Sequence, residues 1–231
     1  MSDPHPHLHV SGGVGAEAVV LVLHGGRSRS HAPVPAGALA VLRMRPIASR
    51  IARVGRGRIA VASLRFAVRG WNGVEASPVA DALWALDQLV DRFGAVPIGL
   101  VGHSMGGRAA LRAAGHPGVE SVVGLAPWLG AGEPIAQLRG RRVLLVHGTR
   151  DRTTSAEGTA SYAEGLRRAG VAASFVEVPG DGHGMLRRPG LWHDLTAGFL
   201  TATLLDPDPS RPLPVADLLQ PVLAGADRVT A

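Results

Sequence analysis

The chain has 231 residues, 46% of them apolar and 18% charged, a composition typical of a globular domain and not of a disordered chain. It contains no cysteine, which excludes disulfides, thiolate nucleophiles and cysteine metal ligands. All 24 basic residues are arginine, with a net charge of +6, and the absence of lysine excludes a phosphate-binding P-loop and a Schiff-base enzyme.

The first twenty residues do not resemble a secretory signal, and no apolar run reaches the roughly 18 residues that span a bilayer. Together with the missing cysteine, this predicts a cytoplasmic protein without a membrane partner. The arginines are spread along the chain and aromatic residues make up only 4%, so we expect no nucleic-acid partner. Six arginines lie between Arg43 and Arg58, and we interpret them as the solvated face of a helix, with a patch for an anionic partner as the alternative.

Apolar, β-branched runs alternate with helical patterns along the chain. This alternation predicts an α/β fold with a central, mostly parallel sheet and helices on both faces. The predicted strands are 18–23, 59–64, 98–101, 119–125, 143–146 and 173–178, and the predicted helices are 38–54, 78–93, 106–114, 156–169 and 191–205.

Three regions are expected along the chain. Residues 1–17 form an N-terminal segment that could be flexible, and 18–205 form the domain. Residues 206–231 form a proline-rich tail, either disordered or packed against the domain as an extended segment with a short helix around 215–223. His5, His7 and His9 alternate with other residues near the start of the chain; we interpret them as part of this terminal segment and expect no metal site.

Residues 102–106 read Gly-His-Ser-Met-Gly and lie between an apolar run and a helical stretch. This is the G-x-S-x-G nucleophile elbow, in which a sharp strand-to-helix turn exposes the serine hydroxyl. Gly102 and Gly106 are expected because side chains two residues to either side of Ser104 would collide as strand and helix close together. The pattern predicts Ser104 as a nucleophile.

A serine hydroxyl needs a general base, and a carboxylate must orient that base. His183 lies in a glycine-flanked loop between the last predicted strand and the last predicted helix, which favours it as the base. Asp151 follows the predicted strand 143–146, at the carboxyl end where catalytic groups of such sheets lie. It is the predicted acid, with capping of the next helix as the structural alternative and Asp181 as the second candidate acid.

His24-Gly25-Gly26 follows the predicted strand 18–23 and is similar to the loop that supplies one oxyanion-hole N–H in lipases and esterases. We predict that the N–H groups of Gly26 and Met105 form this hole. Residues 55–60 match the dinucleotide pattern G-x-G-x-x-A, but they follow a helix and open a strand, which is the reverse of what that motif requires.

These residues, in the order Ser…Asp…His, resemble the α/β-hydrolase family over about 19–205. The resemblance implies a mostly parallel sheet whose early strands include an antiparallel one. Only about 17 residues separate Leu125 from Val143, too few for a multi-helix lid, so we expect no substantial cap domain and an open site. Trp71 and Trp128 are then candidate substrate-binding residues, with packing as the alternative role for each.

The resulting hypothesis is a serine hydrolase that cleaves a carboxylic ester or related small-molecule acyl substrate through an acyl-enzyme on Ser104, without a cofactor. A thioesterase, a peptidase or an acyltransferase with the same three residues is an alternative. A non-catalytic binding protein on a hydrolase scaffold is an alternative of another class. The sequence does not determine the oligomeric state.

Overall fold

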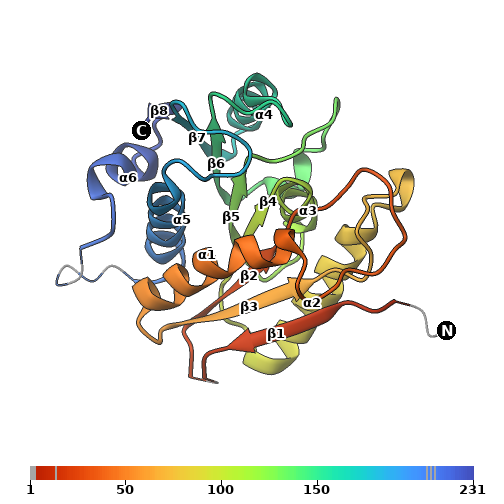
Figure 1. Ribbon diagram of the computed structural model, residues 1–231. Helices are drawn as coiled ribbons and strands as arrows, with labels where there is room; N and C mark the ends of the chain where they lie inside the picture. The colour runs from red at the N-terminus through yellow and green to blue at the C-terminus, as the bar shows by residue number, and fades with distance from the viewer. Residues whose placement is uncertain (1–3, 14, 207, 209, 211) are drawn as a thin grey trace.

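A single eight-stranded sheet organises the chain in the computed structural model, which describes residues 4–13, 15–206, 208, 210 and 212–231 (Figure 1). The strand order is β1-β3-β2-β4-β5-β6-β7-β8. Strand β1 pairs antiparallel with β3, and all the other neighbours are parallel. The strands are β1 (His7–Ser11), β2 (Ala18–Leu23), β3 (Ile59–Arg65), β4 (Ile98–His103), β5 (Val119–Leu125), β6 (Arg142–Gly148), β7 (Ala172–Val178) and β8 (Arg228–Thr230).

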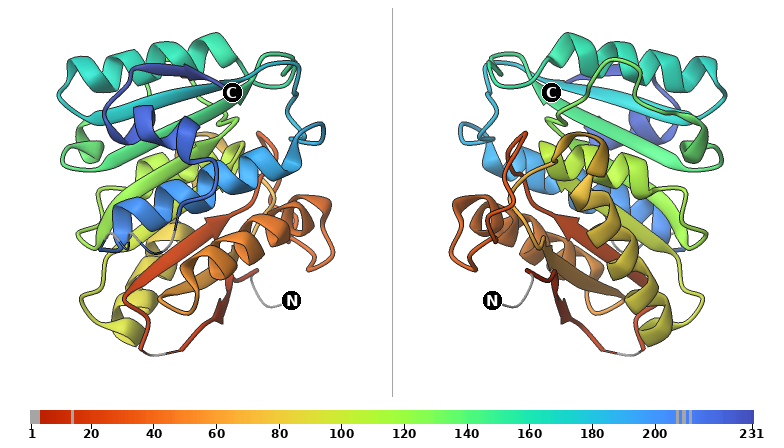
Figure 2. Two further views of the ribbon diagram at one scale, coloured as in Figure 1. Left: turned by 90° about the vertical axis from the view of Figure 1, so that its left-hand side faces the viewer. Right: turned by 90° about the vertical axis from the view of Figure 1, so that its right-hand side faces the viewer.

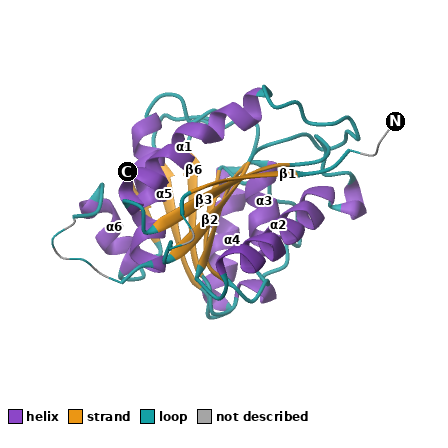
Figure 3. Ribbon diagram, turned by 90° about the horizontal axis from the view of Figure 1, so that it is seen from below, coloured by secondary structure: helices purple, strands orange, loops and turns teal. Residues whose placement is uncertain are grey.

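Helices cover both faces of this sheet (Figure 3). The helices α1, α5 and α6 pack on one face, and α2, α3 and α4 pack on the other. Their bounds are α1 (Leu39–Gly55), α2 (Ser77–Phe93), α3 (Met105–Ala113), α4 (Ala156–Arg168), α5 (Pro189–Leu204) and α6 (Ala216–Leu223). Two single-turn 3-10 helices, η1 (Gly73–Glu75) and η2 (Ala136–Leu138), lie in connecting loops.

The central strands are continuous apolar runs because both of their faces are covered. Every residue of β2 and β4 is buried, as expected for parallel strands between two helical layers. Two hydrophobic clusters result, one on each face of the sheet. The cluster between the sheet and helices α1 and α5 includes Trp192 of α5, which is fully buried. Burial of such a side chain contributes on the order of 2–3 kcal/mol to folding.

All six predicted strands and five predicted helices are present, with ends that differ by at most two residues. The short helix predicted in the tail is α6. Two strands were not predicted. β1 and β8 form opposite edges of the sheet, so both chain ends are tied to it (Figure 2).

The interpretation of His7 and His9 as part of a flexible terminal segment is therefore wrong. These residues belong to β1 and pair with Arg65 and Ser63 of β3. The expected antiparallel early strand is this β1. The division of the chain at residues 17 and 205 stays a prediction.

No cap covers the carboxyl edge of the sheet between β5 and β6. Residues 126–141, all of them described, contain only the single turn η2. The prediction of a fold without a substantial cap domain is confirmed. Among the described helices, none combines the length and the apolar character needed to cross a bilayer.

Candidate active site

Ser104 lies at the sharp junction between β4 and α3, at the carboxyl edge of the sheet. Its backbone adopts φ 56° and ψ −118°, a conformation that a non-glycine residue holds only when the surrounding structure enforces it. A Cβ on Gly102 would collide with the backbone of Gly106, and one on Gly106 would collide with the carbonyl oxygens of residues 23 and 24. The two glycines are thus needed for the turn, as predicted.

The side chains of Ser104, His183 and Asp151 form one continuous chain of contacts. His183 Nε2 lies 3.0 Å from Ser104 Oγ, and His183 Nδ1 lies 2.7 Å from Asp151 Oδ2. The three residues come from three separate turns, after β4, β6 and β7. Because Nδ1 faces a carboxylate, it carries the ring proton, which leaves Nε2 as the acceptor that faces the serine hydroxyl.

The Asp151 side chain has no exposed surface, and several donors hold its carboxylate as an anion. Thr153 N and Thr154 N donate to Oδ1 at 2.7 and 3.0 Å, and the Thr154 hydroxyl donates to Oδ2 at 2.8 Å. Burial opposes ionisation, but the hydrogen bonds from Thr154, His183 and Thr153 outweigh it and lower the pKa of Asp151 to about 2. The carboxylate therefore stays charged beside His183 at neutral pH.

Two partners of Asp151 were not anticipated from the sequence, Thr154 and His147. Besides its hydrogen bonds to Asp151, Thr154 Oγ1 lies 3.2 Å from His183 Nδ1. His147, on β6, points Nε2 at Asp151 Oδ2 from 3.1 Å. A signal for Thr154 exists, because a threonine shortly after an aspartate is typical of a turn closed by side-chain hydrogen bonds.

Asp181, the second candidate acid, has a structural role. Its buried carboxylate accepts hydrogen bonds from Trp192 Nε1 at 2.9 Å and from the backbone N–H groups of Gly182, Arg187 and Arg188. It therefore braces the His183 loop against α5, and the carboxylate bonded to the His183 ring is that of Asp151.

The loop at residues 24–26 lies directly against the nucleophile. A Cβ on Gly25 would sit 3.5 Å from Ser104 Cβ, and one on Gly26 would lie 2.5 Å from the Arg69 carbonyl oxygen and collide with the Met105 side chain. Met105 is the first residue of α3, where an N–H has no acceptor within the helix. Gly26 and Met105, the two residues predicted to form the oxyanion hole, thus lie together beside Ser104.

His24 braces this loop and was not assigned a role from the sequence. Its Nε2 accepts a hydrogen bond from Phe66 N at 3.1 Å, so Nδ1 carries the proton and donates to the Gly25 carbonyl at 2.6 Å. Burial is the main cause that lowers the pKa of His24 to about 4. The ring is therefore neutral, and both of its nitrogens fix the backbone next to Gly26.

Trp71 and Trp128 lie together beside the nucleophile turn. Their rings meet edge to face with centroids 6.2 Å apart, and Trp128 N donates to the Ser104 carbonyl at 3.0 Å. The Arg108 guanidinium lies 4.1 Å from the Trp71 ring and 4.9 Å from the Trp128 ring, and Glu133 pairs with it. Both tryptophans line an open hollow of about 470 Å³, together with Ser28, Arg29, Gly73, Val74, Ala76, Arg108 and Arg112.

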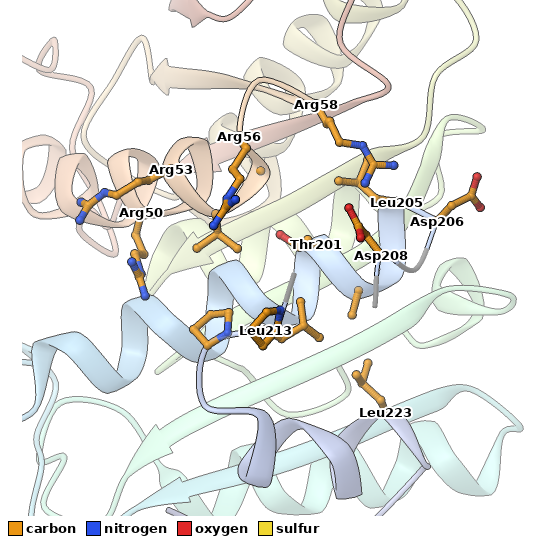
Figure 4. Close-up of a pocket in the computed structure, with 15 residues that line it drawn as sticks. Arg50, Arg53, Arg56, Arg58, Thr201, Leu205, Asp206, Asp208, Leu213 and Leu223 are labelled. Atoms are coloured by element: carbon orange, nitrogen blue, oxygen red, sulfur yellow. The ribbon is translucent and has the colours of Figure 1, made fainter. Parts of the chain in front are cut away.

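A larger cavity of about 660 Å³ lies elsewhere, between the ends of α1 and α5 and the tail (Figure 4). Figure 4 shows Arg56 and Arg58 above Leu205, Leu213 and Leu223. Because α1 ends just before β3 begins, this cavity lies toward the amino ends of the parallel strands. Ser104, Asp151 and His183 lie at their carboxyl ends, so the cavity is separate from this site.

Known proteins share this architecture. A putative α/β-hydrolase from Agrobacterium tumefaciens superposes with a TM-score of 0.66 at 16% identity, over 87% of this chain and 94% of that one. A protein from Xanthomonas campestris, described as an α/β serine hydrolase without a lid, gives a TM-score of 0.64 at 17% identity, over 88% and 91%. A thermophilic esterase from Thermogutta terrifontis gives 0.64 at 21% identity, over 88% and 92%.

No curated protein sequence matches the chain significantly. Two family models do match, and they overlap. The model of the alpha/beta hydrolase fold matches residues 53–163, and the model of TAP-like proteins matches residues 130–229. The eight-stranded sheet and its helical layers agree with these matches. The chain therefore belongs to the α/β-hydrolase family.

Proposed function

We propose that this protein is a serine hydrolase that cleaves a carboxylic ester or a related acyl substrate through an acyl-enzyme on Ser104. The observation that carries the proposal is the chain from Ser104 Oγ through His183 to Asp151, with links of 3.0 and 2.7 Å. Membership of the α/β-hydrolase family supports hydrolase activity. The esterases among the structural neighbours make an ester the first substrate class to test.

In the first half-reaction, Ser104 Oγ attacks the acyl carbon while His183 Nε2 takes the hydroxyl proton. The carbonyl oxygen becomes an oxyanion, which the N–H groups of Gly26 and Met105 stabilise. The tetrahedral intermediate then collapses. The bond to the leaving alcohol breaks, and His183 gives the alcohol its proton.

In the second half-reaction, His183 takes a proton from water as the water attacks the acyl-enzyme. The new intermediate collapses, the carboxylic acid leaves, and the proton returns to Ser104 Oγ. Asp151 stays ionised throughout and stabilises the His183 cation that forms twice in each cycle. All of these steps use side chains and backbone groups of the protein itself.

The hollow lined by Trp71 and Trp128 is the proposed binding site for one part of the substrate. Trp128, which lines the hollow, is joined to the nucleophile turn by its backbone hydrogen bond to the Ser104 carbonyl, and this contact supports the proposal. Trp128, which is half-buried, offers apolar surface, whereas Trp71 is only 3% exposed and packs behind it. Arg29, Arg108 and Arg112 bring three positive charges to the hollow. Glu133 pairs with both Arg108 and Arg112, so its single negative charge balances one of the three.

Labelling with a fluorophosphonate probe, read out by intact mass, tests the proposal. We expect one adduct on the native protein, no adduct on Ser104→Ala, and an unchanged adduct on Ser161→Ala, which alters an exposed serine of α4. An adduct that persists on Ser104→Ala would refute the assignment, as would a folded native protein that does not react. Matched ester, thioester and amide substrates with one acyl group then separate an esterase from a thioesterase and a peptidase.

A further inference from the structure

His147 is a buried histidine in contact with the proposed acid of the site. It lies on β6, four residues before Asp151, and its side chain has no exposed surface. Nε2 lies 3.1 Å from Asp151 Oδ2, and Nδ1 lies 2.9 Å from Thr159 Oγ1 on α4. The same Oδ2 atom also accepts the hydrogen bond from His183 Nδ1 at 2.7 Å. One carboxylate oxygen therefore joins two imidazole rings.

The protonation state of His147 follows from its partners. Burial is the first cause that lowers the pKa of His147, and Asp151 opposes this effect, so we assign a neutral ring. A neutral imidazole carries one N–H. An unprotonated Nε2 would turn a lone pair toward a carboxylate oxygen, so the proton lies on Nε2. Nδ1 then faces the Thr159 hydroxyl as an acceptor at 2.9 Å. The same hydroxyl also reaches the Ser155 carbonyl at 3.1 Å, but that carbonyl already accepts from Thr159 N, so the hydroxyl proton is free to turn to Nδ1.

We propose that His147 is a positioning residue, which holds Asp151 Oδ2 through its Nε2–H and limits how strongly that oxygen stabilises the His183 cation. The inference rests on the proposed function of Ser104 and His183. His183 Nδ1, His147 Nε2 and the Thr154 hydroxyl all donate to this oxygen and share its negative charge, so each is bound less strongly than it would be without the others. Such partners behind the reacting groups both orient and tune them.

Other groups also act on His183, and they must stay constant in any test. Asp151 faces it from the turn after β6 and His103 from the end of β4, while Arg43 on α1 donates to the neighbouring Gly184 carbonyl. Asp181 lies two residues earlier in the same loop and is held by Trp192. A substitution at His147 leaves all four groups in the protein.

Two polar substitutions test the hydrogen bonds of His147 Nδ1 and Nε2 separately. In His147→Asn the amide reaches only the place of Nδ1, so it can bond Thr159 but not Asp151. In His147→Gln the amide nitrogen reaches the place of Nε2, so it can still donate to Asp151. The pair therefore differs in the one hydrogen bond that carries the inference, and His193→Asn, on α5, is a control for the same change elsewhere.

The readout is the pH profile of kcat/KM with an activated ester, and of the rate of fluorophosphonate labelling. With one donor fewer on Oδ2, Asp151 stabilises the His183 cation more strongly, so more alkaline conditions are needed to free the base. We expect His147→Asn to move the midpoint of the acidic limb upward by about half a pH unit or more, and His147→Gln to leave it in place. Equal losses in both variants with an unmoved midpoint would overturn the inference.

A second measurement needs no variant and no turnover. Nitrogen NMR of the histidine rings in the native protein should find His147 protonated at Nε2 and unprotonated at Nδ1 from pH 6 to 8. A proton on Nδ1 instead, or on both nitrogens, would overturn the assignment even if every variant is unstable. Failure of the native protein to react with the fluorophosphonate would instead count against the proposed function, so the two failures can be told apart.

Discussion

The ring of His103 lies against the ring of His183, with centroids 4.7 Å apart, and its Nε2–H donates to the His183 carbonyl at 2.9 Å. Burial, and next the charge that His183 acquires, lower the pKa of His103 to about 3. The ring is therefore neutral when the neighbouring base is protonated. His103 precedes Ser104 in the chain, so one residue ties the base loop to the nucleophile turn.

Replacement of His103 by Phe keeps a ring beside His183 but removes the hydrogen bond to its carbonyl. We expect kcat/KM to fall about tenfold, because loss of one such bond is worth about 1–1.5 kcal/mol and the base is then held less firmly. Steady-state kinetics on an activated ester measure this effect. The same lost bond should lower the thermal midpoint of unfolding by roughly 2–5 °C, and His193→Phe should change neither quantity. Unaltered kcat/KM in His103→Phe would show that the loop is held by other contacts.

The nucleophile turn was predictable from the sequence because its geometry depends on local residues. Gly102 and Gly106 are required by contacts within the turn and with the adjoining strand. Because these glycines lie close to Ser104 in the sequence, a short sequence motif is enough to identify the turn. The positions of Asp151 and His183 follow from the fold, since each comes after a strand whose carboxyl end meets the same edge of the sheet.

The edge strands and the supporting histidines were not predictable in the same way. β1 has only five residues, three of them exposed and two half-buried, and it is a strand because β3 offers a partner 50 to 58 residues away. His24 and His147 are recognisable as histidines in apolar surroundings. Their hydrogen bonds to Phe66 and Asp151, however, depend on how turns pack, which a single sequence does not record.

Gly26→Ala tests the proposed oxyanion hole. A Cβ at this position would collide with the Met105 side chain and lie 2.5 Å from the Arg69 carbonyl oxygen, so the loop must move away from Ser104. We expect kcat to fall about 100- to 1000-fold, as when one oxyanion donor is lost, with KM nearly constant. Gly37→Ala is the matched control, because a Cβ there meets nothing within 4 Å. Equal kinetics for the two variants would exclude Gly26 from the hole.

Asp151→Asn should affect both turnover and the pH dependence of stability. Asparagine cannot hold the His183 tautomer as a carboxylate does, so we expect kcat to fall roughly 1000-fold or more. The pKa of Asp151 is depressed from 3.8 to about 2 in the folded protein. Its ionised form therefore stabilises the fold fully above about pH 4, and this contribution is lost as the pH falls toward 2.

Urea unfolding at pH 7 and at pH 3 measures that contribution. At pH 7 the variant should be less stable than the native protein by about 2 kcal/mol, which is the size of the pKa depression expressed as free energy. At pH 3 the difference should be smaller, because the unfolded chain then binds a proton that the folded chain still excludes. Asp91→Asn, at an exposed position of α2, should give the same small difference at both pH values. A stability difference in Asp151→Asn that is independent of pH would mean that its loss comes from altered packing, and that the buried carboxylate is not held as an anion by its donors.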